Sequence, residues 1–154
     1  MTVVAEQDSL DEASLDDAID EAEDQLGLLF GRVRTVYKDS AIQIHPDLQP
    51  VGYKLLAAIV RAGQTTAGAL AEAHDTDKSV VSRQVRMLEE AGLVVSQPDD
   101  RDGRARVLTP TPIATERVRE VRTQQRNNLR ERLRTRSQQE IETFTELLRL
   151  INQG

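Results

Sequence analysis

An apolar seam near the amino terminus constrains the fold of this chain more than any other feature. Seven apolar residues recur there at alternating steps of four and three: Leu15, Ile19, Ala22, Leu26, Leu29, Val33 and Val36. This spacing is typical of a helix that packs along its length on a partner. Ser14-Leu15-Asp16-Asp17 resembles a capping box, so we expect the helix to begin there and the acidic residues 1–13 to fray. The seam therefore predicts a long amphipathic helix that needs a partner.

The charged residues are distributed unevenly along the chain. The formal net charge of the 154 residues is −6, with 20 Lys and Arg against 26 Asp and Glu. The first 31 residues hold ten of these carboxylates and no Lys or Arg, so the rest of the chain carries all 20 basic residues against 16 acidic ones. An acidic whole-chain balance therefore does not exclude a polyanionic partner.

Several classes of function are disfavoured by residues that the sequence lacks. It contains no Cys, only two His, no Gly-rich phosphate loop and no Gly-x-Ser-x-Gly motif. The longest apolar run, Leu55 to Val60, is far shorter than the roughly 20 residues of a membrane span. We see no signal peptide. We therefore expect a cytoplasmic protein that is not an enzyme and has no metal, no cofactor and no membrane partner.

The middle of the chain has the outline of a helix-turn-helix. Pro50 is well placed as the first residue of a helix that Gly63 ends. A short helix over Thr66 to His74, a turn at residues 75–77 and a helix over Lys78 to Ala91, closed by Gly92, are expected to follow.

After Gly92 the pattern changes to that of a β-hairpin. Two short runs rich in β-branched residues, Leu93 to Gln97 and Ala105 to Thr109, flank a charged segment that contains the turn dipeptide Asp102-Gly103. Thr111-Pro112 then caps and opens another helix, and residues 137–140 form a capping box before the last one. The apolar stripe of this last helix consists of Ile141, Phe144, Leu148 and Ile151.

The helix from Lys78 to Ala91 has two different faces. Its apolar residues Val81, Val85 and Leu88 are spaced to pack inward. Another face carries hydroxyls and guanidinium groups without a carboxylate: Ser79, Ser82, Arg83 and Arg86. Such a face suits a recognition helix that enters the major groove of DNA, although a solvated face would look alike.

The ordered set of these motifs resembles the MarR family of winged-helix transcription regulators. The segments that carry the resemblance are Leu70-Ala71, Ser79-Val80-Val81-Ser82-Arg83, the run from Leu88 to Val94, Asp99-Asp100-Arg101-Asp102-Gly103-Arg104 and Leu108-Thr109. Pro110-Thr111-Pro112 departs from the family, which usually has a less rigid segment with a Gly there.

The resemblance implies a mostly α-helical fold with a small β-hairpin wing (α+β), in which a winged helix-turn-helix is flanked by long dimerisation helices. Residues 49–111 would form the DNA-binding domain, and residues 14–48 and 112–151 the dimerisation region. The implied function is that of a homodimeric repressor on a near-palindromic DNA operator.

The resemblance also implies roles for individual residues. Arg104 would enter the minor groove with Asp102 holding it, and Arg101 would contact a phosphate or pair with Asp99. The residues expected in or beside the major groove are Lys78, Ser79, Ser82, Arg83 and Arg86. A small aromatic or phenolic effector would bind near Tyr37, His45 and Tyr53.

One alternative function remains open at this point. The winged domain could serve protein–protein contacts without sequence-specific DNA binding, and the acidic amino terminus could then serve a basic partner. Salt titration separates the two possibilities, because DNA binding releases counterions and weakens steeply with added salt.

Overall fold

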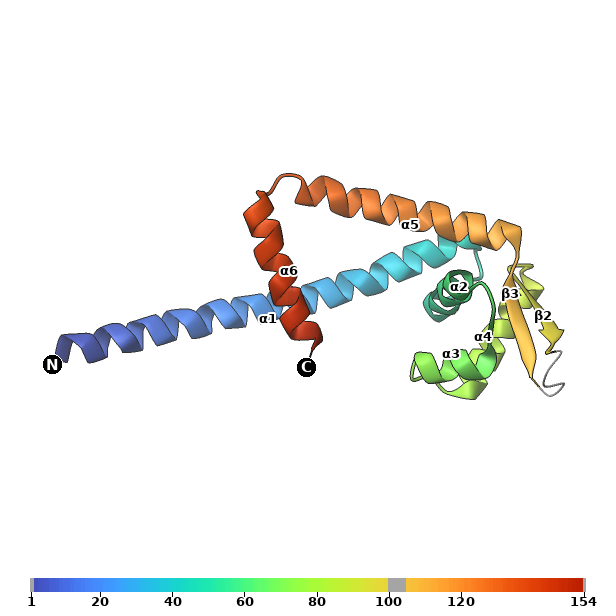
Figure 1. The fold of residues 1–154 in the computed structure, drawn as a ribbon, viewed down its shortest axis with the longest axis horizontal. Coiled ribbons are helices and arrows are strands. Elements are labelled where there is room, and N and C mark those ends of the chain that lie inside the picture. Colours follow the sequence, from blue (N-terminus) through green and yellow to red (C-terminus); the bar gives the residue numbers. More distant parts are fainter. Residues whose placement is uncertain (1, 100–104, 154) are drawn as a thin grey trace. The chain divides into compact units, whose positions relative to one another are not determined.

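The structure, a computed structural model, describes residues 2–99 and 105–153, with side chains from residue 14 onward. The chain forms two compact units, residues 1–54 and 55–154. In chain order, the elements are α1 (Thr2–Ile44), α2 (Pro50–Ala62), β1 (Thr65–Thr66), α3 (Ala67–Ala73), α4 (Lys78–Glu90), β2 (Val94–Pro98), β3 (Arg106–Pro110), α5 (Pro112–Leu133) and α6 (Gln138–Asn152). Figure 1 labels all of these except β1. The described residues form mostly helices and one small antiparallel sheet, which confirms the predicted fold class. None of the described helices has the length and apolar character that a membrane crossing requires.

The first helix begins earlier than the sequence predicts. α1 runs without a break from Thr2 to Ile44, so Ser14 lies inside it and does not cap it. The predicted helix start at Ser14 is therefore wrong, whereas the fraying of residues 1–13 stays a prediction. No Gly or Pro interrupts residues 2–13, and Ala, Glu, Gln and Leu in this segment favour a helix, so the weak capping signal does not set its start.

The core of the second unit is aliphatic. Leu55, Leu56 and Ile59 of α2 are at most 1% exposed, and Leu70, Val81, Leu88, Leu93 and Leu108 complete the main buried set. α2 begins at Pro50 and ends before Gly63, as predicted. Gly63 has a φ of +73°, which favours glycine after a helix end.

The sheet has three strands among the described residues, in the order β1-β3-β2. β2 and β3 form the predicted hairpin, each shifted by one residue from its expected bounds, with Ser96 opposite Leu108 and Pro98 opposite Arg106. The sequence analysis missed β1, in which Thr65 pairs with Leu108. A strand of two residues has no alternation to detect, and Thr66, at the start of the predicted helix, is the N-cap of α3 instead.

Thr111 connects the hairpin to the next helix. Its backbone N–H donates to the Leu93 carbonyl oxygen at 3.0 Å, and its hydroxyl donates to the Gly92 carbonyl oxygen, also at 3.0 Å. The same hydroxyl accepts from the Ala114 N–H, so Thr111 caps α5 with Pro112 in the first turn. The rigid Pro-Thr-Pro segment thus joins the sheet to α5 by defined hydrogen bonds.

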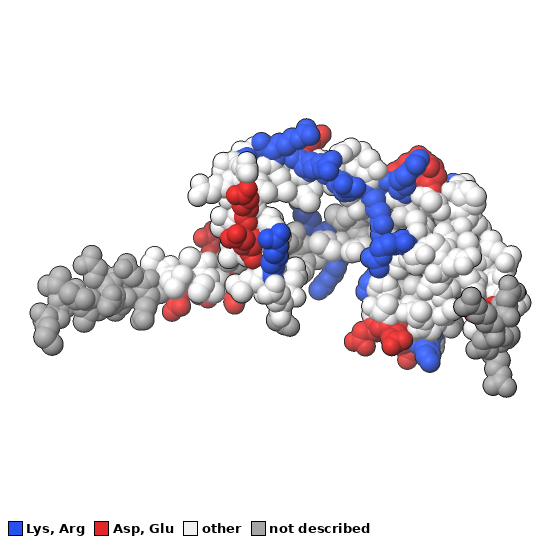
Figure 2. Space-filling model, viewed as in Figure 1, with Lys and Arg blue, Asp and Glu red and all other residues white. Residues whose placement is uncertain are grey.

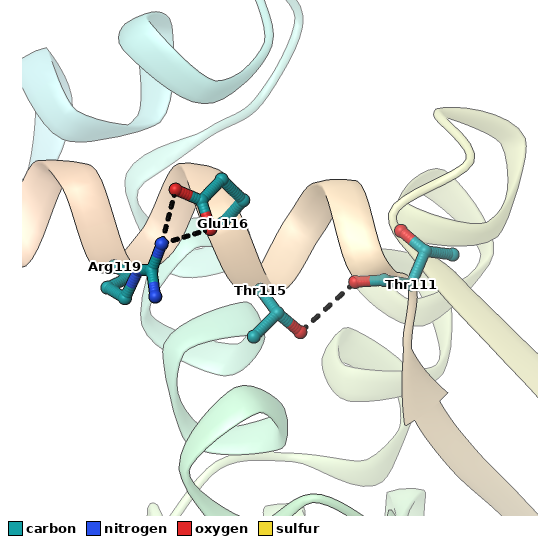
Figure 3. Close-up of polar contacts among 4 residues, drawn as sticks. All are labelled: Thr111, Thr115, Glu116 and Arg119. Carbon is teal, nitrogen blue, oxygen red and sulfur yellow. Dashed lines mark hydrogen bonds and ion pairs between the residues drawn. The ribbon is translucent and has the colours of Figure 1, made fainter.

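The first turns of α5 carry further local hydrogen bonds. Figure 3 shows the Thr115 hydroxyl donating to the Thr111 carbonyl oxygen at 3.1 Å. It also shows Arg119 donating to both oxygens of Glu116 at 2.6 Å. These hydrogen bonds and the ion pair raise the pKa of Arg119 above its ordinary value. Arg119 is therefore a guanidinium already matched by a carboxylate.

The last helix begins at the predicted capping box. The Ser137 hydroxyl accepts from the Glu140 N–H at 3.3 Å, while the Ser137 N–H donates to Glu140 Oε2 at 2.8 Å. A hydrogen bond with the backbone of Ser137 and a weaker one with its side chain lower the pKa of Glu140. None of the α6 residues is buried.

A buried amide on α4 gives a test of this packing. Gln84 is 8% exposed, and its Oε1 has no hydrogen-bond partner among the described residues. Gln84→Met keeps a similar volume and removes the unpaired oxygen, so it should raise the free energy of unfolding by about 1 kcal/mol. Urea unfolding at a fixed protein concentration measures this difference. Arg83→Met, at an exposed position of the same helix, is the control, and a loss of stability in the Gln84 variant would contradict the prediction.

Candidate nucleic-acid interface

The turn between α3 and α4 fixes the start of the candidate recognition helix. Asp75 adopts a φ of +46°, a left-handed conformation that Asp tolerates better than most residues. The Thr76 N–H donates to the Ala71 carbonyl oxygen at 2.9 Å, which closes the end of α3. Asp77 then caps α4 by accepting from the Ser79 N–H at 2.6 Å. This is the tight helix-turn-helix that the sequence predicts.

The two faces of α4 lie as the sequence pattern predicts. Val81 and Leu88 are fully buried and Val85 is 7% exposed, so these side chains attach the helix to the core. Lys78, Ser79, Ser82, Arg83 and Arg86 are all exposed. The structure therefore brings together the five α4 residues that we expected at a DNA surface.

The exposed side chains of α4 differ in how they are engaged. Arg86 Nε lies 3.6 Å from Glu90 Oε1, and both side chains are largely exposed. Such a surface pair contributes little energy, so a phosphate or a base can replace Glu90 as the partner. Arg83 and Lys78 have no ion pair among the described residues. Of the two Arg side chains on this face, Arg83 is therefore the one without a carboxylate partner among the described residues.

Ser79 has a structural task at the start of the helix. Hydrogen bonds from its side chain and its backbone N–H to the Asp77 carboxylate hold the pKa of Asp77 below its ordinary value. The Ser79 backbone N–H donates to Asp77 Oδ1 at 2.6 Å, so Ser79 takes part in the cap of α4 while the residue stays exposed.

The described part of the hairpin reaches up to the wing tip. The Asp99 N–H donates to the Ala105 carbonyl oxygen at 3.0 Å, which continues the pairing of β2 and β3. The predicted wing residues Arg101, Asp102 and Arg104 lie outside the described residues. Their roles remain predictions.

Sequence reasoning missed one basic residue of the hairpin. Arg106 begins β3, and its Nε donates to the Ser96 hydroxyl at 2.6 Å while its Nη2 donates to the Ser96 carbonyl oxygen at 2.6 Å. The sequence gives no signal for this contact, because it depends on the register of the two strands.

Basic residues also follow α5. Arg122, Arg126 and Arg130 are spaced four residues apart, so they share one side of the helix. Figure 2 shows a row of Lys and Arg side chains along this helix. Arg122 donates to the Ala57 carbonyl oxygen of α2 at 3.4 Å, while Arg126 and Arg130 are exposed. The row adds to the positive potential of the second unit.

Two of the three predicted effector residues lie together. The rings of Tyr37 and Tyr53 have centroids 5.5 Å apart with an interplanar angle of 57°. Tyr53 is buried, whereas Tyr37 is 37% exposed. His45 is engaged in its own turn, where its Nδ1 accepts from the Asp47 N–H at 3.3 Å. The tyrosine pair is therefore the part of the predicted set that forms a cluster.

The lowered pKa of Asp77 predicts how the start of α4 responds to pH. A carboxyl whose pKa is lowered on folding stabilises the protein above its ordinary pKa, and this gain disappears as the pH falls through the folded-state pKa. Asp77→Asn keeps a capping oxygen that does not titrate. The stability advantage of the wild type over this variant should therefore shrink between neutral pH and about pH 3.

Urea unfolding of both proteins across this pH range, at one protein concentration, measures the difference. Asp77→Ala is a second comparison that removes the cap and should be less stable than Asp77→Asn at every pH. A wild-type advantage that stays constant with pH would exclude the charged cap.

Known proteins are similar to this chain in both sequence and fold. The model of the MarR family matches residues 47–105. The uncharacterized HTH-type transcriptional regulator YxaD of Bacillus subtilis is 30% identical over 121 residues, which cover 79% of this chain and 85% of that protein.

Solved structures agree in fold at lower sequence identity. Streptococcus pneumoniae FabT in complex with DNA gives a TM-score of 0.80 at 15% identity, covering 88% of this chain and 95% of that chain. The YusO protein from Bacillus subtilis gives a TM-score of 0.71 at 18% identity, covering 90% and 97% of the two chains. The chain belongs to the MarR family of winged helix-turn-helix regulators, which bind DNA to control transcription.

Proposed function

We propose that this regulator is a homodimeric repressor that binds a near-palindromic operator, with α4 of each protomer in the major groove of one half-site. The observation that carries the proposal is the exposed face of α4 with Ser82, Arg83 and Arg86, where the ion pairs among the described residues include only the solvent-exposed pair of Arg86 with Glu90. Arg is the side chain best suited to bidentate contact with guanine. The early turns of a recognition helix are the part that meets base edges. Ser82 and Arg83 lie in the second turn of α4, and Arg86 follows in the third.

The wing supplies the second part of the proposed interface. Arg104 enters the minor groove, Asp102 orients it, and Arg101 contacts a phosphate. A minor groove narrowed over A·T-rich sequence has a strong negative potential that favours an inserted Arg. The described strands of the hairpin pair regularly up to Asp99 and Ala105, so they give the tip a firm base. The likeness in fold to FabT, whose structure is in complex with DNA, supports this mode of binding.

The proposed dimer follows from apolar residues that a single chain leaves exposed. In α1, Leu15 is 60% and Leu28 is 67% exposed, and Ile19, Leu29 and Val33 are at least 40% exposed. In α6, Leu147 and Ile151 are more than half exposed. Both stripes have helical spacing and need a partner to be buried. A second copy of the chain is the partner in this proposal, and it also sets two winged domains on two half-sites.

A small aromatic or phenolic acid is the proposed effector. Tyr37 is partly exposed and its ring packs on buried Tyr53, so Tyr37 is the ring of this pair that an aromatic ligand can reach. His45 is close to both in sequence. Binding to a conformation that does not fit the operator would release the DNA by population shift.

The dimer is tested by a charge placed on the exposed stripe of α6. Leu147 is 54% exposed in one chain, so Leu147→Asp should leave an isolated chain folded. In a dimer interface the same carboxylate would be buried without a partner, which is strongly unfavourable. Light scattering should give about twice the 17.2 kDa chain mass for the wild type and the single chain mass for the variant. Arg149→Asp, on the polar side of α6, should remain dimeric, and a wild-type monomer would refute the proposal.

Base reading by α4 is tested with Arg83→Ala. An operator is first selected from random DNA with the purified protein. Arg83→Ala should then weaken binding to this operator by about 1–3 kcal/mol and binding to random DNA by less, because base contacts discriminate between sequences. Fluorescence anisotropy measures both affinities, and Arg119→Ala, which removes a guanidinium already paired with Glu116, is the control.

Equal losses on the two DNAs would assign Arg83 to the phosphate backbone instead. A wild type without salt-dependent binding to any DNA would favour the alternative, in which the winged domain contacts another protein.

A further inference from the structure

The second unit contains a groove between the candidate recognition helix and the hairpin. It has a volume of about 440 Å³ and is lined by residues of α3, α4, β2 and β3 together with Thr66 and Ala105. Ser82 and Glu89 of α4 lie on one wall, and Ser96 and Arg106 of the hairpin line it as well. The groove thus joins a residue of the proposed DNA face to the arginine that the sequence analysis missed.

Strand register holds Arg106 in a fixed position in this groove. Arg106 pairs with Pro98, and Leu108 pairs with Ser96, so Arg106 and Ser96 are diagonal neighbours on one face of the sheet. Two donors of the guanidinium, Nε and Nη2, bind the Ser96 hydroxyl and carbonyl oxygens at 2.6 Å. Nη1 and the second hydrogen of Nη2 have no hydrogen-bond partner among the described residues. The side chain is therefore oriented before any ligand arrives, which lowers the entropy cost of binding.

The charge of Arg106 is not neutralised within the described part of the chain. No carboxylate there forms an ion pair with it, and the side chain is exposed. Both bonds that hold it use neutral oxygens of Ser96. Arg106 thus differs from Arg86 and Arg119, which already have carboxylate partners.

We propose that Arg106 is a preset phosphate-binding residue, held by Ser96 to contact the DNA backbone between α4 and the wing. The inference rests on the proposed function, because it takes α4 to lie in the major groove and the wing in the adjacent minor groove. The sugar–phosphate strand separates these two grooves, so a phosphate of that strand faces the groove between the two protein elements. A guanidinium with free donors forms charge-assisted hydrogen bonds to a phosphate.

The negative charge of Glu89 indicates whether Arg106 binds a phosphate of DNA or a free anion. Its carboxylate lines the same groove and repels a small anion that only this site holds. A phosphate within DNA is kept in place by the contacts of α4 and the wing on either side, so it can bind Arg106 despite Glu89. We therefore assign the site to the DNA backbone.

The test measures binding of the full-length protein to the selected operator and to random DNA at several salt concentrations. Arg106→Ala should weaken both by the same factor, about tenfold or more, and should lower the salt slope by about one unit per bound protomer. Ser96→Ala keeps the charge but removes one of the holding bonds, so it should weaken binding with little change in slope. Arg106→Lys keeps the charge but cannot form both hydrogen bonds to Ser96, so its affinity for DNA should lie between those of the wild type and Arg106→Ala.

Arg119→Ala is the matched control, since it removes the same charge from a residue that is already paired. Its affinity and salt slope should equal those of the wild type. If Arg106→Ala does not fold, as judged by circular dichroism, Ser96→Ala and Arg106→Lys test the same prediction.

The outcomes separate this inference from the proposed function. Wild-type affinity and slope in Arg106→Ala, together with lost operator preference in Arg83→Ala, would overturn the phosphate role and leave DNA reading intact. A loss on the operator alone would also overturn it, because it would make Arg106 a base-reading residue. A wild type without salt-dependent DNA binding would instead refute the proposed function.

Discussion

The burial of one side of α4 is the constraint on which the rest of the structure depends. Val81, Val85 and Leu88 are held in the core, and this fixes the rotation of the helix about its axis. Because side chains of a helix are locked in their angular order, the opposite side with Ser82 and Arg83 must then face solvent. Loss of this packing would free the helix to rotate and would mix the two faces. The proposed reading of DNA by α4 therefore depends on the buried apolar residues Val81, Val85 and Leu88.

Local hydrogen bonds at the ends of the elements hold α4 and the hairpin in fixed positions relative to each other. Asp77 begins α4, and Gly92, with a φ of +68°, allows the chain to turn directly into β2. Thr111 then binds the carbonyl oxygens of Gly92 and Leu93 and caps α5. One residue thus connects the segment that follows α4, the sheet and α5. In this way the hairpin is set at a defined place beside α4, where the groove with Arg106 forms.

Much of this arrangement could be predicted from the sequence, because its signals are local. Pro50, Thr111-Pro112 and the box at Ser137 each act within one helical turn, and all three mark helix starts in the structure. The predicted start of α1 at Ser14 is wrong, because one weak capping signal does not end a helix within a segment that contains good helix formers. β1 and the contact of Arg106 with Ser96 could not be predicted, because both depend on pairing between segments distant in sequence. The exposed face of α4 could be predicted from helical spacing alone. The roles of the wing-tip residues stay predictions.

The central claim, that α4 of each protomer reads one half-site from the major groove, is tested most directly by guanine methylation interference on the selected operator. Methylation at N7 places a methyl group in the major groove, where an Arg of α4 would bind guanine. The account predicts that methylated guanines block binding in two clusters, related by the operator's symmetry and about 10 base pairs or a multiple of this apart. A single cluster, or tight and specific binding that no methylated guanine impairs in an operator with guanines in both half-sites, would contradict it.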